Sequence, residues 1–109
     1  MHKKINEMFS RMEKLKLMKG LMWDYNIPPE HCLEVLEGSR KTAGHYNEAT
    51  LFRKLLESYP WFTVLKILTV ERISELLTEK VIQSLRFKSI RTAYEFVRKR
   101  LSEAVPASG

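Results

Sequence analysis

The hydrophobic positions near the start of the chain fall on one face of a helix. Between Lys3 and Lys19, apolar side chains recur three or four positions apart, with charged side chains mostly between them. The apolar positions are Ile5, Met8, Phe9, Met12, Leu15 and Met18. This spacing predicts an amphipathic helix that Gly20 ends, giving an N-terminal segment over residues 1–20. Because methionine adapts to irregular surfaces, this helix is expected either to complete the domain's own core or to dock on a partner.

Prolines and capping residues divide the rest of the chain into short helices. A helix cannot continue through Pro28 and Pro29, and Pro60 forces a second break. Together with the apolar spacing, these breaks predict helices over 30–37, 48–59, 61–68, 70–77, 79–85 and 90–104. The expected caps are Asn47, Thr69, Thr78 and Ser89 at N-termini and Gly38 at a C-terminus.

The chain therefore predicts an all-α fold, a compact single-domain bundle of six or seven mostly short helices. No segment alternates apolar and polar residues as a half-buried strand does, and residues 39–46 are expected to form an irregular loop. The helical domain is expected to span residues 21–104. Residues 105–109 are expected to be a disordered tail.

Composition narrows the class of protein. The 109 residues are 44% hydrophobic, enough for one core, and Cys32 is the single cysteine, so no internal disulfide can form. No apolar run resembles a signal peptide or a membrane span, which indicates a soluble cytoplasmic protein without membrane partners. The net charge is +6, and residues 86–109 hold six Lys/Arg against two acids. This excess suits an acidic partner or serves solubility alone.

Catalytic and metal-binding patterns are absent from the sequence. His2, His31, Cys32 and His45 are the potential ligands, but none has metal-ligand spacing, and His31 and Cys32 diverge on a helix. Cys32 with His45 as a base is the only conceivable nucleophile pair, and their relative position cannot be deduced. Glycine-rich phosphate loops and G-x-S-x-G motifs do not occur. We expect no enzyme, no cofactor and no small-molecule substrate.

Basic residues gather around the last predicted helix. They are Arg86, Lys88, Arg91, Arg98, Lys99 and Arg100. Arg91 and Arg98 share a face with Tyr94 between them, an arrangement that suits contact with a phosphate backbone. Residues 70–101, three successive predicted helices that include the last one, are also compatible with a helix-turn-helix arrangement. The alternative interpretation is that Tyr94 belongs to the core and the arginines only solvate the surface.

An aromatic segment is the second candidate surface. Trp23 and Tyr25 flank Asp24, and tryptophan and tyrosine dominate the energetics of protein interfaces. The segment, with Met8 and Met12 of the first helix, is a candidate partner-binding surface. Equally, Asp24 can cap a turn and Trp23 can be buried.

This aromatic segment also carries a resemblance. Leu21-Met22-Trp23-Asp24-Tyr25-Asn26 resembles the opening of small uncharacterised bacterial helical proteins, with Met22 where an aromatic residue is usual. Further matching positions are Leu55-Leu56-Glu57, Trp61, Glu71-Arg72-Ile73 and Ser89-Ile90-Arg91, so the resemblance spans residues 21–101. Some members resemble partners of nucleotidyltransferase toxins, which implies an antitoxin-like role.

Two functions are therefore expected. The first is a non-catalytic protein-interaction module that binds another protein, or a second copy of itself as a homodimer. The resemblance implies that this module is antitoxin-like. The alternative is a nucleic-acid-binding regulator that uses the basic residues of the last helix.

Overall fold

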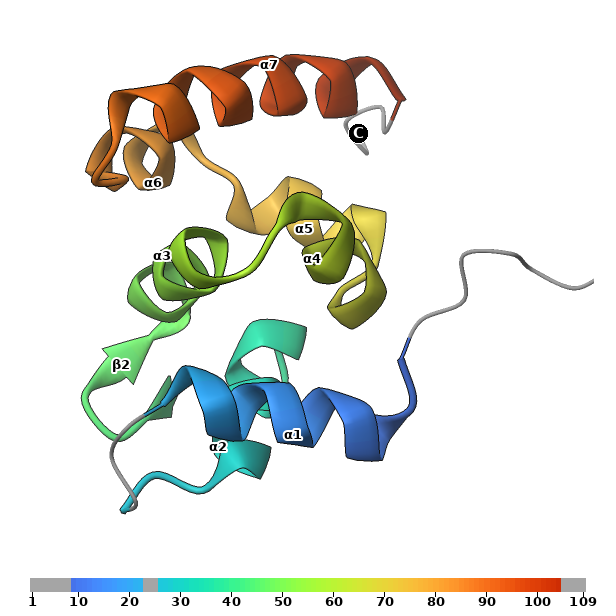
Figure 1. The fold of residues 1–109 in the computed structure, drawn as a ribbon, viewed down its shortest axis with the longest axis vertical. Helices are drawn as coiled ribbons and strands as arrows, with labels where there is room; N and C mark the ends of the chain where they lie inside the picture. Colours follow the sequence, from blue (N-terminus) through green and yellow to red (C-terminus); the bar gives the residue numbers. More distant parts are fainter. Residues whose placement is uncertain (1–8, 23–25, 105–109) are drawn as a thin grey trace, which may run out of the picture.

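The computed structural model describes residues 9–22 and 26–104, and over these ranges the chain is almost wholly helical (Figure 1). The described elements are α1 (Arg11–Leu21), α2 (Pro29–Glu37), β1 (Thr42–Ala43), β2 (Tyr46–Asn47), α3 (Glu48–Ser58), α4 (Trp61–Ile67), α5 (Val70–Leu76), α6 (Glu79–Ser84) and α7 (Lys88–Ala104). The predicted all-α bundle of mostly short helices is confirmed.

The helices stack from one end of the molecule to the other. In Figure 1, α1 and α2 lie at one end, α3 to α5 occupy the middle, and α7 crosses the opposite end beside α6. A single apolar core runs through all of them, from Met18 of α1 through Phe52 of α3 to Tyr94 of α7. The first helix therefore completes the domain's own core, with Met18 and Leu21 buried.

Hydrogen-bonding side chains begin three of the helices as expected. Asn47 Oδ1 accepts a hydrogen bond from the backbone N–H of Thr50, and the hydroxyls of Thr69 and Thr78 accept from N–H groups three residues on. These caps satisfy donors that have no partner within the helix. Gly38 ends α2 in the left-handed conformation, with φ 94°.

The first helix differs from its prediction at both ends. Ser10 has extended backbone, its hydroxyl accepts from the N–H of Glu13, and the Glu13 carboxylate accepts from the N–H of Ser10. This reciprocal capping box starts the helix at Arg11, so a continuous helix from Lys3 is wrong. The helix also passes through Gly20 to Leu21, because Leu21 is buried in the core and holds the last turn in place.

A small hairpin lies where the sequence predicted an irregular loop. Thr42 pairs with Asn47, and Ala43 pairs with Tyr46, in antiparallel register. Gly44 opens the two-residue turn with φ 61°, a conformation that costs glycine little. An added Cβ there would lie 2.6 Å from Ile27 Cδ1, so a larger residue would force the Ile27 side chain to shift. Sequence alternation could not reveal this hairpin because each strand has two residues.

The last helix begins earlier than predicted. It starts at Lys88, and the backbone carbonyl of Phe87 accepts hydrogen bonds from the N–H groups of Ile90 and Arg91. Ser89 therefore lies inside the helix, and its predicted capping role is wrong. Val70 occupies an apolar position of the helix predicted over 70–77, which places it in the core, but it is exposed at the start of α5.

One arginine joins three helices of the bundle. Arg72 of α5 donates from Nε to the carbonyl oxygen of Leu36 at 2.7 Å and from Nη2 to that of Val35 at 3.3 Å. The same guanidinium pairs with Glu48 of α3 at 2.8 Å and with Glu75 at 3.0 Å. Burial alone would lower the pKa of Arg72, but the two carboxylates outweigh burial and raise it. Arg72 therefore remains charged and satisfies carbonyls at the end of α2.

Candidate functional site: an apolar groove beside the last helix

A groove of about 770 Å³ lies between α7 and the corner that joins α3 to α4. Its lining comes from the end of α3, the start of α4 and the first half of α7. The lining residues are Leu56, Glu57, Ser58, Tyr59, Pro60, Trp61, Ser89, Ile90, Thr92, Ala93, Tyr94, Phe96 and Val97. The groove is open to solvent, and its surface is largely apolar.

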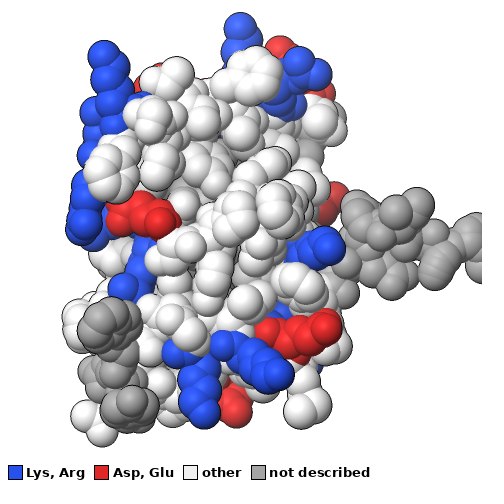
Figure 2. Space-filling view, in the orientation of Figure 1, with Lys and Arg blue, Asp and Glu red and all other residues white. Residues whose placement is uncertain are grey.

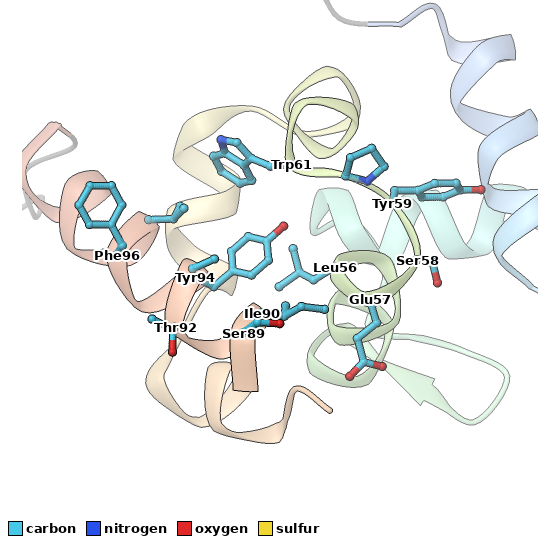
Figure 3. A pocket seen from close by; sticks show the side chains of 13 residues that line it. Leu56, Glu57, Ser58, Tyr59, Trp61, Ser89, Ile90, Thr92, Tyr94 and Phe96 are labelled. Carbon is cyan, nitrogen blue, oxygen red and sulfur yellow. The ribbon is translucent and has the colours of Figure 1, made fainter. Parts of the chain in front are cut away.

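Tyr94 forms the floor of this groove. Its side chain stands between Trp61 and Leu56 in Figure 3, and its hydroxyl points toward the space between them. The rings of Trp61 and Tyr94 meet edge to face, with centroids 5.8 Å apart. Tyr94 is only 6% exposed, and no described residue hydrogen-bonds to its hydroxyl. Burial raises the pKa of Tyr94, so the hydroxyl stays protonated and remains a potential donor at neutral pH.

The backbone explains why these residues meet. Pro60 stops α3 and precedes the first turn of α4, so Trp61 lies at the corner between the two helices. On α7, Ile90, Tyr94 and Val97 follow helical spacing and face the corner. The sequence placed these three residues correctly on one helix face. It did not reveal that Trp61, 29 or more residues away along the chain, lies opposite them.

Phe96 forms an exposed wall of the groove. It lies off the buried stripe of α7 and is 61% exposed. The guanidinium carbon of Arg100 lies 5.8 Å from the centre of the Phe96 ring. In the sequence, Phe96 lies off the apolar stripe of the last predicted helix, and a large aromatic residue in such a position indicates an exposed contact surface.

Charge lies around this groove rather than in it. On the face shown in Figure 2, uncharged side chains cover the middle, and lysines and arginines gather at the margins. Glu57 is the one acidic residue in the groove lining, and its Oε2 accepts a hydrogen bond from the backbone N–H of Arg86 at 2.7 Å. The acid is therefore engaged within the molecule and holds the segment before α7 against α3.

The six predicted basic residues do not form one uniform surface. Three are engaged: Arg91 donates to the carbonyl of Leu85 at 2.8 Å, Arg98 approaches Glu79 at 3.6 Å, and Arg100 approaches Glu103 at 3.9 Å. The side chains of Arg86, Lys88 and Lys99 are exposed, and no described carboxylate pairs with them. Arg91 and Arg98 were expected to share one basic helix face. Arg91 is instead directed to the end of α6, where its guanidinium binds the carbonyl of Leu85.

The predicted aromatic anchor and part of the first helix fall in segments outside the described residues. Trp23, Asp24, Tyr25 and Met8 lie outside the described residues, as does His2. Met12 is largely exposed on α1, although the apolar stripe placed it beside buried positions. Its exposure leaves it accessible to a partner, as the partner-binding hypothesis requires.

The structure does not bring the potential nucleophile and base together. Cys32 is completely buried in α2, and burial raises the pKa of its thiol. His45 is exposed in the hairpin turn and stacks on Tyr46 with ring centroids 4.4 Å apart. Over residues 9–22 and 26–104, no three His, Cys, Asp or Glu side chains gather as a metal site would require.

Fold and groove together define a small helical domain with an open aromatic surface. Comparison with protein-family models, with curated proteins and with solved structures gives no match to this chain. The resemblance to antitoxin-like proteins accordingly stays a prediction. No described helix has the length and apolar character to cross a membrane.

Proposed function

We propose that this chain is a non-catalytic protein-interaction module whose groove receives apolar side chains from an acidic helical segment of another protein. The observation that carries the proposal is Tyr94, a buried aromatic residue whose unpartnered hydroxyl points into an apolar groove. The hydroxyl is therefore free to donate a hydrogen bond to a carbonyl or carboxylate of a partner, while the surrounding aromatic lining offers apolar contact.

The groove lining supports an apolar anchor. Trp61, Tyr94 and Phe96 offer aromatic surface along one side of α7, and aromatic residues dominate interface energetics. A volume of about 770 Å³ lies within the usual range for ligand sites, and its open form suits side chains projecting from a helix.

The charge at the margins supports an acidic partner. Arg86 precedes α7 and Lys88 is its first residue, so both lie at one end of the groove. Lys99 and Arg100 lie about two helical turns beyond the middle of the groove, at its other end. A partner helix with an apolar stripe and acidic flanks complements this distribution. Such complementarity raises association rates and excludes basic partners.

The test uses a synthetic probe because the partner is unidentified. A fluorescent amphipathic peptide with Leu and Trp on one face and Glu on the others is titrated with the full chain, and anisotropy is measured. A peptide with Lys in place of Glu controls for charge, and a scrambled acidic peptide controls for the apolar stripe. The proposal requires that the acidic amphipathic peptide bind most tightly.

A pair of phenylalanines supplies matched variants. Phe96, in the groove wall, is 61% exposed, and Phe87, outside the groove, is 58% exposed. Phe96→Ser is expected to weaken peptide binding by about tenfold or more, the usual range for an anchor contact, and Phe87→Ser to leave it unchanged. Equal effects of the two substitutions, or no binding by the acidic peptide, would refute the proposal.

The remaining expectations extend this proposal. An antitoxin-like role would make the partner a toxin with an acidic helix, and a cytoplasmic location agrees with a lone, reduced cysteine. Nucleic-acid binding by Arg86, Lys88 and Lys99 is the second candidate, supported by their exposure without ion pairs. Salt-dependent binding of a mixed-sequence DNA duplex tests this candidate.

A further inference from the structure

Arg53 of α3 is an incompletely satisfied cation on another part of the surface. Its Nε is buried and has no hydrogen-bond partner, the single such side-chain atom found among the described residues. No described carboxylate forms an ion pair with its guanidinium. An unsatisfied buried donor on a charged group is costly and calls for an acceptor.

Arg72 is a useful comparison, because each nitrogen of its guanidinium has an acceptor within the fold. The Arg72 guanidinium has two backbone carbonyls and two carboxylates as acceptors. Arg53, on α3 of the same bundle, has neither kind of acceptor among the described residues. The Arg53 guanidinium therefore lacks an acceptor within the described part of the chain.

The surroundings of Arg53 form a second cavity. It has a volume of about 320 Å³, lies between α3 and α6, and is lined by Asn47, Ala49, Thr50, Arg53, Thr78, Lys80, Val81 and Ser84. The lining holds two cations and no acidic residue. The two carboxylates adjacent in sequence to lining residues are engaged elsewhere: Glu48 pairs with Arg72, and Glu79 contacts Arg98 and Gln83.

Hydroxyl and amide groups complete the cavity. The Thr78 hydroxyl accepts from the N–H of Val81, which leaves its proton available, and Asn47 uses its amide oxygen to cap α3. Thr50 and Ser84 direct their hydroxyl protons to backbone carbonyls. The exposed lining is largely apolar, and its charged groups are two cations with no carboxylate among them.

We propose that this cavity binds the oxyanion of a phosphate group, held by Arg53 and Lys80. The planar guanidinium pairs with two oxygens, Lys80 adds a point charge, and Thr78 and Asn47 supply neutral donors. Because Nε is shielded from solvent, binding includes a rotation of the Arg53 side chain that presents Nε and one Nη to the anion. The proposal is independent of the peptide groove.

Nuclear magnetic resonance tests it directly on the full chain. Inorganic phosphate is titrated at constant ionic strength, and chloride at the same ionic strength is the control. The Nε–H signal of Arg53 and the backbone amides of Thr78 to Lys80 are expected to shift saturably with phosphate only. Signals that do not move, or that move equally with chloride, would show that water alone fills the cavity and would overturn the proposal.

Three variants assign the binding to this cavity. Lys80→Gln, at an exposed position, and Arg53→Gln are each expected to weaken phosphate binding by about tenfold, since each removes a charged donor. Lys54→Gln makes the same charge change on α3 outside the cavity lining and is expected to have no effect. Because Arg53→Gln can also perturb folding, Lys80→Gln decides: unchanged affinity in that variant contradicts the proposal.

A last titration identifies the source of the phosphate. The chain is titrated with a mixed-sequence DNA duplex. If the duplex binds and this binding is lost in Lys80→Gln, the cavity binds the phosphates of a nucleic-acid backbone. A saturable response to inorganic phosphate without any response to the duplex assigns it to a small phosphorylated molecule.

Discussion

Replacing Arg72 by Met is expected to destabilise the fold by about 2–4 kcal/mol. Methionine retains most of the apolar stem, so the substitution removes mainly the charge and the hydrogen bonds. The Arg72 side chain is 17% exposed, whereas its carboxylate partners Glu48 and Glu75 are 57% and 67% exposed. Ion pairs with such exposed partners are worth about 0–1 kcal/mol, so they contribute the smaller part.

The larger part comes from the carbonyls of Val35 and Leu36. A hydrogen bond from a charged donor contributes about 1.5–3 kcal/mol, and the loss is greatest when the acceptor left behind is shielded. The bond to Leu36 at 2.7 Å has good length, whereas the bond to Val35 at 3.3 Å is weaker. One strong and one weak hydrogen bond, together with the small contribution of the two ion pairs, give the expected loss of about 2–4 kcal/mol in the free energy of unfolding.

Urea denaturation followed by circular dichroism measures this loss. The midpoint is expected to fall while the slope remains unchanged, since the unfolded surface does not change. Arg40→Met is the matched control, because among the described residues Arg40 pairs with Glu34 alone, in an exposed contact at 2.9 Å. The reasoning fails if the two substitutions lower the midpoint equally, or if Glu48→Gln alone reproduces the effect of Arg72→Met.

Three further predictions concern Gly44, Cys32 and Glu34. Gly44→Ala is expected to cost about 1–3 kcal/mol in urea denaturation, because its φ is positive and an added Cβ meets Ile27 at 2.6 Å; an unchanged midpoint would contradict this. Burial raises the pKa of Cys32 above 9.0, so its contribution to stability is present below that pH and is lost as pH rises through the folded pKa. A thiol reagent at pH 8 should then label Cys32 only as fast as the chain opens, and rapid labelling would refute complete burial. The hydrogen bond from Arg40 lowers the pKa of Glu34 below 4.5, so the contribution of this contact is present above 4.5 and is lost as pH falls through the folded value. Arg40→Gln should bring that pKa back toward 4.5 in a carboxyl titration followed by nuclear magnetic resonance, and no change would show that the contact does not persist in solution.

The peptide groove and the phosphate cavity lie on different parts of α3. The groove uses the end of that helix with α7, and the cavity uses its first two turns with α6. Their variants therefore separate the two proposals. Phe96→Ser should leave phosphate binding intact, and Lys80→Gln should leave binding of the acidic peptide intact.

Local patterns in the sequence predicted the fold class and most of the helices. Apolar spacing, the breaks at Pro28 and Pro60, and the caps at Asn47 and Thr69 act within a few residues, so they are readable without tertiary information. The start of α1 was also present in the sequence, as the Ser10–Glu13 capping box. The continuous apolar stripe across residues 3–19 concealed it.

Only the tertiary structure decided which side chains could act together. Ile90, Tyr94 and Val97 belonged to a predictable helix face, but packing placed Trp61 opposite them and formed the groove. The sequence likewise did not distinguish the basic residues of α7 from one another. In the folded chain, Arg91 donates a hydrogen bond to the carbonyl of Leu85, whereas Lys88 and Lys99 are exposed. Arg53 differs from Arg72 only in what the fold places around it. Periodicity specifies the faces of helices, but burial and pairing depend on neighbours distant in the chain, which no local pattern encodes.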